Sequence, residues 1–182
     1  MSRRSKRLLV TVVAVATVLS LVVAFAVANL AYPQTGRPER TDVVLVLGPA
    51  TSDRIALAES LMKKGLSSNL LVSVGSSKTT DDPDRICSKK VSYMVYCAVP
   101  DPFTTQGEAR WLGRMAQEHG WKSATVITFK PHITRARIIV QRCFSGELDM
   151  LAITTPLSLI DWMYQFAYQN AAYVKVALTP GC

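Results

Sequence analysis

A long uncharged segment near the N-terminus constrains this chain more than any other feature. Residues 8–30 contain no charged side chain and are dominated by Val, Leu and Ala. At about 1.5 Å per residue, a helix of this length crosses a hydrocarbon core of roughly 30 Å. The basic residues within residues 1–7 favour a cytoplasmic position for that flank, which sends the rest of the chain outside. The sequence therefore predicts a single-pass membrane anchor, with the membrane as a partner of residues 8–30.

A cleaved signal peptide is the alternative interpretation of the same segment. Ala26-Val27-Ala28 resembles the small-residue motif that precedes a signal-peptidase cut. The apolar run is longer, however, than the roughly 7–15 residues usual for the apolar part of a signal peptide. We therefore favour an uncleaved anchor. Both interpretations place residues 42–182 outside the cytoplasm, behind a linker at residues 31–41 that contains Pro and Gly.

The basic charge of the chain does not indicate nucleic-acid binding. The net charge is +8, and half of it comes from four residues within residues 1–7. No Lys/Arg run and no ladder of stacking aromatics follows, although both are typical of nucleic-acid surfaces. The motifs G-x-G-x-x-G, G-x-x-x-x-G-K-[ST] and G-x-S-x-G are also missing from the sequence, which argues against the corresponding dinucleotide, P-loop and hydrolase sites.

Four cysteines lie in the expected exported domain, and an even number there favours two disulfides. Three pairings are possible. We favour Cys87–Cys97, which closes a short loop, and Cys143–Cys182, which would staple the C-terminal segment to a helix. Free buried thiols are the alternative. Because no C-x-x-C pair is present and the two histidines are not at ligand spacing, no metal site is predicted.

Short apolar runs alternate with helical patterns throughout residues 42–182. Runs without polar alternation are typical of strands buried on both faces, and strands that alternate with helices imply parallel pairing through right-handed crossovers. We therefore predict an α/β fold: a three-layer, Rossmann-like, doubly wound and mainly parallel sheet, preceded by one transmembrane helix. Strands are expected at residues 43–47, 70–74, 93–99, 124–129 and 148–154, and helices at 52–64, 105–119, 134–144 and 157–175, with an irregular segment at 76–92.

The predicted topology brings several strand-to-helix loops to one place. In an open parallel sheet, these loops gather at the carboxyl edge, where ligands bind. Residues 48–52, 101–105 and 130–134 would meet there, and Gly48 and Gly75 would border the same crevice. We expect this edge to be the functional site.

The loop after the fourth predicted strand carries His132, one of only two histidines. Its ordinary pKa near neutrality suits a general acid or base, and the structural alternative is a histidine that only hydrogen-bonds a neighbouring loop. Thr134 and Arg135 follow in the first helical turn, where free backbone N–H groups and the helix dipole favour an anion. A cation at Arg135 is disfavoured there unless an anion binds or a carboxylate, Asp101 or Glu108, pairs with it.

Further polar residues lie at the same predicted edge. Thr105 and Glu108 fit the capping-box pattern, in which each side chain satisfies a backbone N–H of the other. Asp101, at a strand exit, would orient the histidine or receive a metal ion. Arg54 would be a second anion clamp, and its alternative is a solvated or ion-paired surface arginine. Thr104 is expected to contact the ligand.

Five segments of the chain together carry a resemblance to a known family. They are Asp42-Val-Val-Leu-Val-Leu-Gly48, Arg54 with Ala58 and Leu61, Leu71-Val-Ser-Val-Gly75, Thr104-Thr-Gln-Gly-Glu-Ala109, and His132-Ile-Thr-Arg-Ala136. In residue type and order they resemble the YdcF/SanA/ElyC family of bacterial cell-envelope proteins. The resemblance implies a Rossmann-like domain behind an anchor in the bacterial plasma membrane. It also implies a role in envelope integrity or peptidoglycan precursor metabolism.

The chain departs from that family pattern at three places. Pro49 stands where the family often has a second glycine, residues 76–78 stand where it often has an acidic stretch, and Glu108 stands where asparagine is common. The acidic stretch of the family faces the ligand. The resemblance therefore implies no particular ligand or cofactor, and S-adenosylmethionine binding, attributed to some members, is not carried over.

Three functions are compatible with these residues. The first is a hydrolase or transferase acting on a phosphorylated or lipid-linked envelope precursor, with His132 moving a proton and Arg54 and Arg135 holding the anion. The residues expected to orient that substrate are Asp101, Thr105 and Glu108. The second function is a non-catalytic module that binds a nucleotide-like or polyprenyl-phosphate ligand in the same crevice. The third is a scaffolding domain without a ligand. The residues indicate neither a cofactor nor an oligomeric state.

Overall fold

The computed structural model describes residues 3–75 and 83–182. Its five parallel strands form one sheet in the order β3-β2-β1-β4-β5. The strands are β1 (Val43–Val46), β2 (Asn69–Ser73), β3 (Met94–Ala98), β4 (Ser123–Phe129) and β5 (Glu147–Ile153). Each lies within one residue of the predicted run, and every neighbouring pair is parallel. The predicted α/β fold is confirmed.

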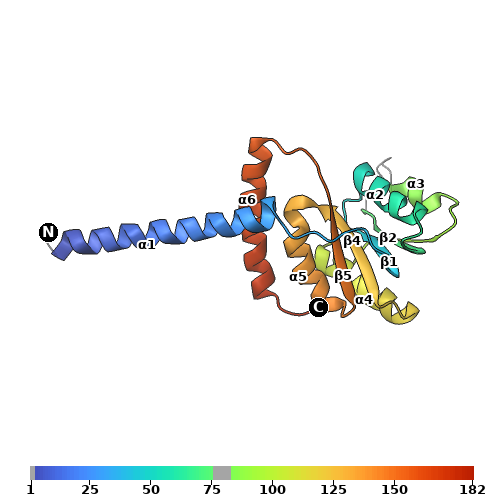
Figure 1. Cartoon of the computed structure of the whole chain (residues 1–182). Coiled ribbons are helices and arrows are strands. Elements are labelled where there is room, and N and C mark those ends of the chain that lie inside the picture. Colours follow the sequence, from blue (N-terminus) through green and yellow to red (C-terminus); the bar gives the residue numbers. More distant parts are fainter. Residues whose placement is uncertain (1–2, 76–82) are drawn as a thin grey trace.

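Helices cover both faces of the sheet and give three layers (Figure 1). α2 (Ser52–Lys63) and α3 (Pro83–Ser88) pack on one face, and α4 (Thr105–His119) and α5 (Ile133–Cys143) pack on the other. Strand order reverses between β1 and β4, and such a switch point is where doubly wound sheets bind ligands.

The predicted irregular segment at residues 76–92 is partly wrong, because α3 lies within it. This helix is only six residues long and begins with Pro83, a residue suited to a first helical turn. A helix this short carries too few apolar positions to show a helical period. The stretch 76–82, including the departure from the family pattern at 76–78, lies outside the described residues.

Side chains of the central strand alternate between two cores. Val44 and Val46 face the cluster formed with α2 and α3, whereas Val43, Leu45 and Leu47 face the cluster formed with α4 and α5. All five are at most 1% exposed. Because both faces of β1 are covered, the sequence shows a continuous apolar run, and each buried side chain stabilises the fold by about 1.5–3 kcal/mol.

The N-terminal segment forms α1 (Arg3–Ala26), which continues into a π-helical turn, η1 (Val27–Ala31). Together they are long and apolar enough to cross a membrane, and the most apolar window is entirely unburied. In Figure 1, α1 projects away from the α/β domain. Its end is fixed to that domain, since Thr134 Oγ1 donates to the carbonyl of Asn29 at 3.1 Å.

The predicted linker, residues 31–41, packs on the domain. The Gly36 N–H donates to the carbonyl of Met150 in β5 at 2.9 Å, and Arg137 Nη2 donates to the carbonyl of Gln34 at 2.7 Å. Gly36 also lies directly against Asp149, where a Cβ would collide. These contacts set how the anchor leaves the domain.

The last helix, α6 (Leu159–Leu178), lies beside the end of α1 and runs across its direction in Figure 1. It begins at a capping box, in which Ser158 Oγ accepts from the Asp161 N–H and the Asp161 carboxylate accepts from the Ser158 N–H. Only Gln169 and Val176 are buried along its length. The helix was predicted from the sequence, but its position against the sheet edge was not.

Both predicted disulfides are present. Cys87–Cys97 joins α3 to β3, and Cys143–Cys182 joins the end of α5 to the segment that follows α6. No free cysteine occurs among the described residues. A disulfide stabilises mainly by restricting the unfolded chain, typically by about 2–4 kcal/mol.

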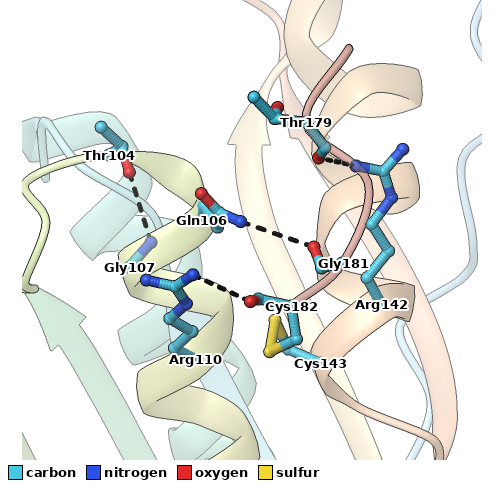
Figure 2. The surroundings of a disulfide bond; sticks show 9 residues. All are labelled: Thr104, Gln106, Gly107, Arg110, Arg142, Cys143, Thr179, Gly181 and Cys182. Atoms are coloured by element: carbon cyan, nitrogen blue, oxygen red, sulfur yellow. Dashed lines mark hydrogen bonds between the residues drawn. A yellow bond between two sulfur atoms is a disulfide. The ribbon is translucent and has the colours of Figure 1, made fainter. Parts of the chain in front are cut away.

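Hydrogen bonds reinforce the second disulfide. Figure 2 shows Arg110 of α4 donating to the carbonyl of Cys182 at 2.8 Å and Arg142 of α5 donating to the carbonyl of Thr179, also at 2.8 Å. The segment after α6 is therefore held against α4 and α5 by one covalent link and several polar contacts.

Candidate functional site

A cleft of about 460 Å³ lies at the carboxyl edge of the sheet, beside the switch point. Its walls are the loops that follow β1, β3 and β4, together with α6. The lining residues are Gly48, Pro49, Arg54, Pro100, Phe103, Thr104, Thr105, Glu108, Phe129, His132, Arg135, Tyr164, Gln165, Tyr168 and Gln169. The structure thus brings together most of the residues that the sequence singled out.

Arg54 begins in α2 and reaches back under the end of β1. Its Nη1 donates to the carbonyls of Leu47 at 3.0 Å and Pro49 at 2.9 Å, and its guanidinium carbon lies 5.4 Å from the centre of the Phe129 ring. The residue is only 5% exposed, so the alternative of a solvated surface arginine is wrong. Burial lowers the pKa of Arg54 and the Glu108 carboxylate opposes this, but arginine stays charged in proteins.

Glu108 lies one turn into α4 and points at the end of β1. Its Oε1 accepts from the Gly48 N–H at 2.6 Å, and the side chain is 4% exposed. The predicted capping box of Thr105 and Glu108 is wrong, because the N-cap is Thr104 rather than Thr105. Thr104 is the N-cap, and its hydroxyl accepts from the Gly107 N–H at 3.3 Å. This shift leaves the Glu108 carboxylate free to face the cleft.

Burial raises the pKa of Glu108, and the neighbouring Ser73 hydroxyl, Gly48 N–H, Arg54 and Arg135 oppose that rise. The Ser73 hydroxyl lies near the carboxylate, yet it forms no hydrogen bond of normal geometry in the described structure. A Cβ at position 48 would lie 3.1 Å from Ser73 Oγ and 3.3 Å from Glu108 Oε1. Glycine at position 48 therefore leaves room for the Ser73 hydroxyl and the Glu108 carboxylate at the end of β1.

His132 ends a short 3₁₀ turn, η2 (Lys130–His132), that leads directly into α5. Its Nδ1 lies 3.0 Å from Thr128 Oγ1, and its Nε2 lies 3.4 Å from Thr105 Oγ1. Burial lowers the pKa of His132 well below its ordinary value, and the charges of Arg135 and Arg54 lower it further. The imidazole is therefore neutral at pH 7.

Arg135 forms the opposite side of the cleft, in the first turn of α5. Its Nε donates to Gln169 Oε1 at 2.8 Å, and its guanidinium carbon lies 5.9 Å from the centre of the Tyr168 ring. Gln169 is fully buried, and its Nε2 donates to Gln165 Oε1 at 3.0 Å. Two side chains of α6 thus orient this arginine.

The carboxylate partners proposed for Arg135 do not pair with it. Within the described ranges, neither Asp101 nor Glu108 lies within ion-pair distance, although the Glu108 charge raises the pKa of Arg135 against the larger lowering by burial. The electrostatic cost of placing the Arg135 cation near the N-terminus of α5 is therefore not offset by an ion pair with either of these carboxylates.

Three predicted residues are not brought into the cleft. Asp101 and Gly75 are exposed and do not line it. Thr134 uses its hydroxyl to hold the anchor through Asn29. The backbone N–H groups at the start of α5 were expected to be free for a ligand. One of them, the Ile133 N–H, instead donates to the carbonyl of Lys130 in the preceding 3₁₀ turn.

The contribution of α6 to the cleft was missed. It supplies the lining residues Tyr164, Gln165, Tyr168 and Gln169. The only local signal was the pair of glutamines four residues apart in a mostly apolar helix, a spacing that puts both on one face. That face lines the cleft because α6 packs over the carboxyl edge of the sheet, and the sequence of the helix does not reveal this packing.

Comparison with known proteins adds no relative: no protein-family model, no curated protein and no solved structure matches the chain. Among the described residues, no group of three or more His, Cys, Asp and Glu is placed to hold a metal ion. In the described part of the chain, the cleft offers two guanidinium groups, one carboxyl, one neutral imidazole and several hydroxyl and amide groups.

Proposed function

We propose that this chain is a membrane-anchored bacterial protein whose extracytoplasmic domain binds a phosphorylated, lipid-linked cell-envelope precursor in the cleft. The observation that carries the proposal is that Arg54 and Arg135 line one cleft in which Glu108 is the only carboxyl among the described residues. The described lining residues therefore carry a net positive charge whether or not that carboxyl is ionised. Guanidinium groups are the preferred partners of phosphate because their N–H groups match its oxygens.

Location supports the same proposal. α1 is long and apolar enough to anchor the chain, and two disulfides fit an oxidising compartment. The resemblance to the YdcF/SanA/ElyC family points to envelope precursors, in particular those of peptidoglycan, as the substrate class. The uncleaved anchor belongs to this proposal, because its end packs on the domain and helps to hold α5.

The test is a thermal-unfolding titration of the full chain in detergent micelles with phosphate, pyrophosphate and farnesyl phosphate. A ligand at 100 times its dissociation constant stabilises the fold by about 2.7 kcal/mol. We expect this stabilisation for the wild type and its loss in Arg135→Gln. The control is Arg114→Gln, since Arg114 is exposed on α4 outside the cleft. Absence of any shift in the wild type, or an equal shift in Arg135→Gln, would contradict the proposal.

A second candidate function, phosphoryl hydrolysis, is favoured by one observation. The cleft is lined by a neutral imidazole, His132, and by a carboxyl whose pKa is raised by burial, Glu108, so a group that can accept a proton and a group that can donate one line the same cavity. A water oxygen would attack phosphorus and give its proton to His132. The bond from phosphorus to the leaving oxygen would break, and protonated Glu108 would supply that oxygen with a proton.

Phosphate release from farnesyl pyrophosphate distinguishes hydrolysis from binding. General acid–base groups typically contribute about 10²–10⁴-fold to a rate, so His132→Gln should lower release by at least about 10²-fold while retaining the thermal shift with phosphate. Binding without phosphate release in the wild type would leave the non-catalytic module. Equal release in His132→Gln would exclude His132 as the base.

A further inference from the structure

The outward face of α6 is apolar and uncovered. Ile160 is 78% exposed, Met163 66%, Val174 60% and Leu178 76%. Along its whole length the helix carries only two charged residues, Asp161 and Lys175. A surface helix in water normally opposes its buried face with polar residues, and contiguous exposed apolar faces mark interaction sites.

The exposed apolar residues share one side of the helix. At 100° per residue, Ile160, Ala167, Val174 and Leu178 fall along one stripe, opposite the buried Gln169 and Val176. The cleft is bordered by a third side of α6 and the end of the anchor by a fourth. The outward stripe, in contrast, borders neither the cleft nor the groove beside the anchor.

The anchor meets α6 directly. The rings of Phe25 and Tyr173 lie edge to face with centres 5.5 Å apart. A strongly apolar groove between the two segments is lined by Ala26, Leu30, Trp162 and Phe166, among others. In Figure 1, α1 leaves on the side of α6 away from the sheet, and α6 runs across its direction.

We propose that α6 lies flat in the polar–apolar interface of the outer leaflet, with its outward face inserted among the lipids. This inference rests on the proposed crossing of the membrane by α1. When α1 spans the bilayer, its end marks the membrane surface, and α6, which crosses that end, lies in the plane of the surface. An amphipathic helix in this position buries its apolar face about 5–10 Å into the headgroup and acyl boundary.

The bilayer fits this face better than a second copy of the chain, because the face is continuous with the anchor. Two tyrosines on the cleft side, Tyr164 and Tyr168, are stacked with ring centres 5.8 Å apart and are 62% and 48% exposed. Tyrosine is enriched at the level of the lipid headgroups, because its apolar ring can contact the acyl chains while its hydroxyl group is hydrated.

This placement gives the cleft its access route. Tyr164 and Tyr168 line the cleft, so its mouth lies at the same depth as α6. A phosphate carried on a membrane lipid then reaches Arg135 without leaving the bilayer. The ligand class narrows from phosphorylated molecules in general to those whose phosphate sits at the headgroup level.

Photo-crosslinking tests this in the full chain, reconstituted in nanodiscs of phosphatidylethanolamine and phosphatidylglycerol. The photoreactive residue p-benzoylphenylalanine is installed at Ile160, Ala167 or Val174, and at the exposed Gln117 of α4 as the matched control. We expect about tenfold or more lipid adduct at the α6 positions, because their face lies among acyl chains. Lipid adducts at the level of the control would overturn the proposal. Crosslinks between two chains at Ile160 and Val174 would also overturn it, and would show that a second copy of the chain covers this face.

Two measurements separate this inference from the proposed function. Release of the chain from membranes by alkaline carbonate would show that α1 does not span, and would overturn the anchor and the interfacial helix together. Retention of the chain without α6 adducts would overturn the interfacial placement alone. The thermal shift with phosphate in micelles is independent of both, and its failure would overturn only the anion site.

Discussion

The two ends of strand β1 differ in how the nearby carboxylates are hydrogen-bonded. At its start, the Asp42 carboxylate accepts from the Lys122 N–H at 2.7 Å, the Ser123 N–H at 2.9 Å and Ser123 Oγ at 3.0 Å. At its end, Glu108 receives one backbone N–H from Gly48 and lies among arginines that it does not pair with.

The pKa values follow this difference. Hydrogen bonds, that of the Lys122 N–H first, lower the pKa of Asp42, whereas burial raises the pKa of Glu108. A hollow of about 560 Å³ also exists at the starting edge, but the charged residues around it, Lys122 and Glu147, are exposed. The polar groups at the start of β1 form hydrogen bonds with one another and stabilise the fold, whereas the buried charged groups at its end keep hydrogen-bonding atoms without a partner among the described residues. Volume alone does not distinguish the two.

Arg54→Ala should have the largest effect on stability. The substitution removes two hydrogen bonds to carbonyls and leaves Glu108 buried beside one fewer cation. Removing one member of a buried charged cluster typically costs about 3–5 kcal/mol. Urea unfolding of the full chain in micelles measures this, with Arg114→Ala expected within about 0.5 kcal/mol of wild type. A loss of unfolding free energy below about 1 kcal/mol would show that the charged groups at the end of β1 matter no more for stability than those at its start.

Acid should weaken the fold through His132. Its folded pKa lies below the unfolded value near 6.5, so the unfolded state binds the proton first, and stability is full above pH 6.5 and falls below it. The slope is at most about 1.4 kcal/mol per pH unit, continuing until the folded pKa is reached. Thermal unfolding between pH 7.5 and 5 should show this slope in wild type. The same slope in His132→Gln would assign it to another group.

Asp42→Ala should cost about 1 kcal/mol, because the carboxylate is exposed and water replaces part of what is lost. Its lowered pKa adds stability above about pH 3.8 that disappears only in stronger acid. The phosphate-induced thermal shift should be unchanged in this variant. A reduced shift would show that the two ends of β1 are coupled.

Glu108→Gln should have the smallest effect, a gain of about threefold in phosphate affinity, or roughly 0.65 kcal/mol. The amide still accepts from the Gly48 N–H, while the negative charge near the bound anion is removed. Isothermal calorimetry at pH 8, where ionisation of Glu108 is most complete, measures this gain. Weaker binding would instead show that the carboxyl contacts the ligand as a proton donor.

The sequence predicts the sheet well, because β1 to β5 are buried and buried strands leave uninterrupted apolar runs. It also predicts Arg54, Glu108, His132 and Arg135, because parallel topology dictates which loops meet. It does not predict that Thr104 rather than Thr105 caps α4, since adjacent threonines are equivalent in a pattern. Nor does it place Gln169 beside Arg135, because that contact depends on how a helix packs on an edge far away in sequence.

The link between Cys143 and Cys182 supports one wall of the cleft from its far end. It spans 39 residues and holds the segment after α6, and α6 carries the glutamine that orients Arg135. While both sulfurs remain thiols, as in a reducing compartment, this wall has only non-covalent support at its far end. If the cleft binds an anion as proposed, the reduced chain should bind it more weakly than the oxidised chain, because the glutamine that orients Arg135 then lies on a helix held by non-covalent contacts alone.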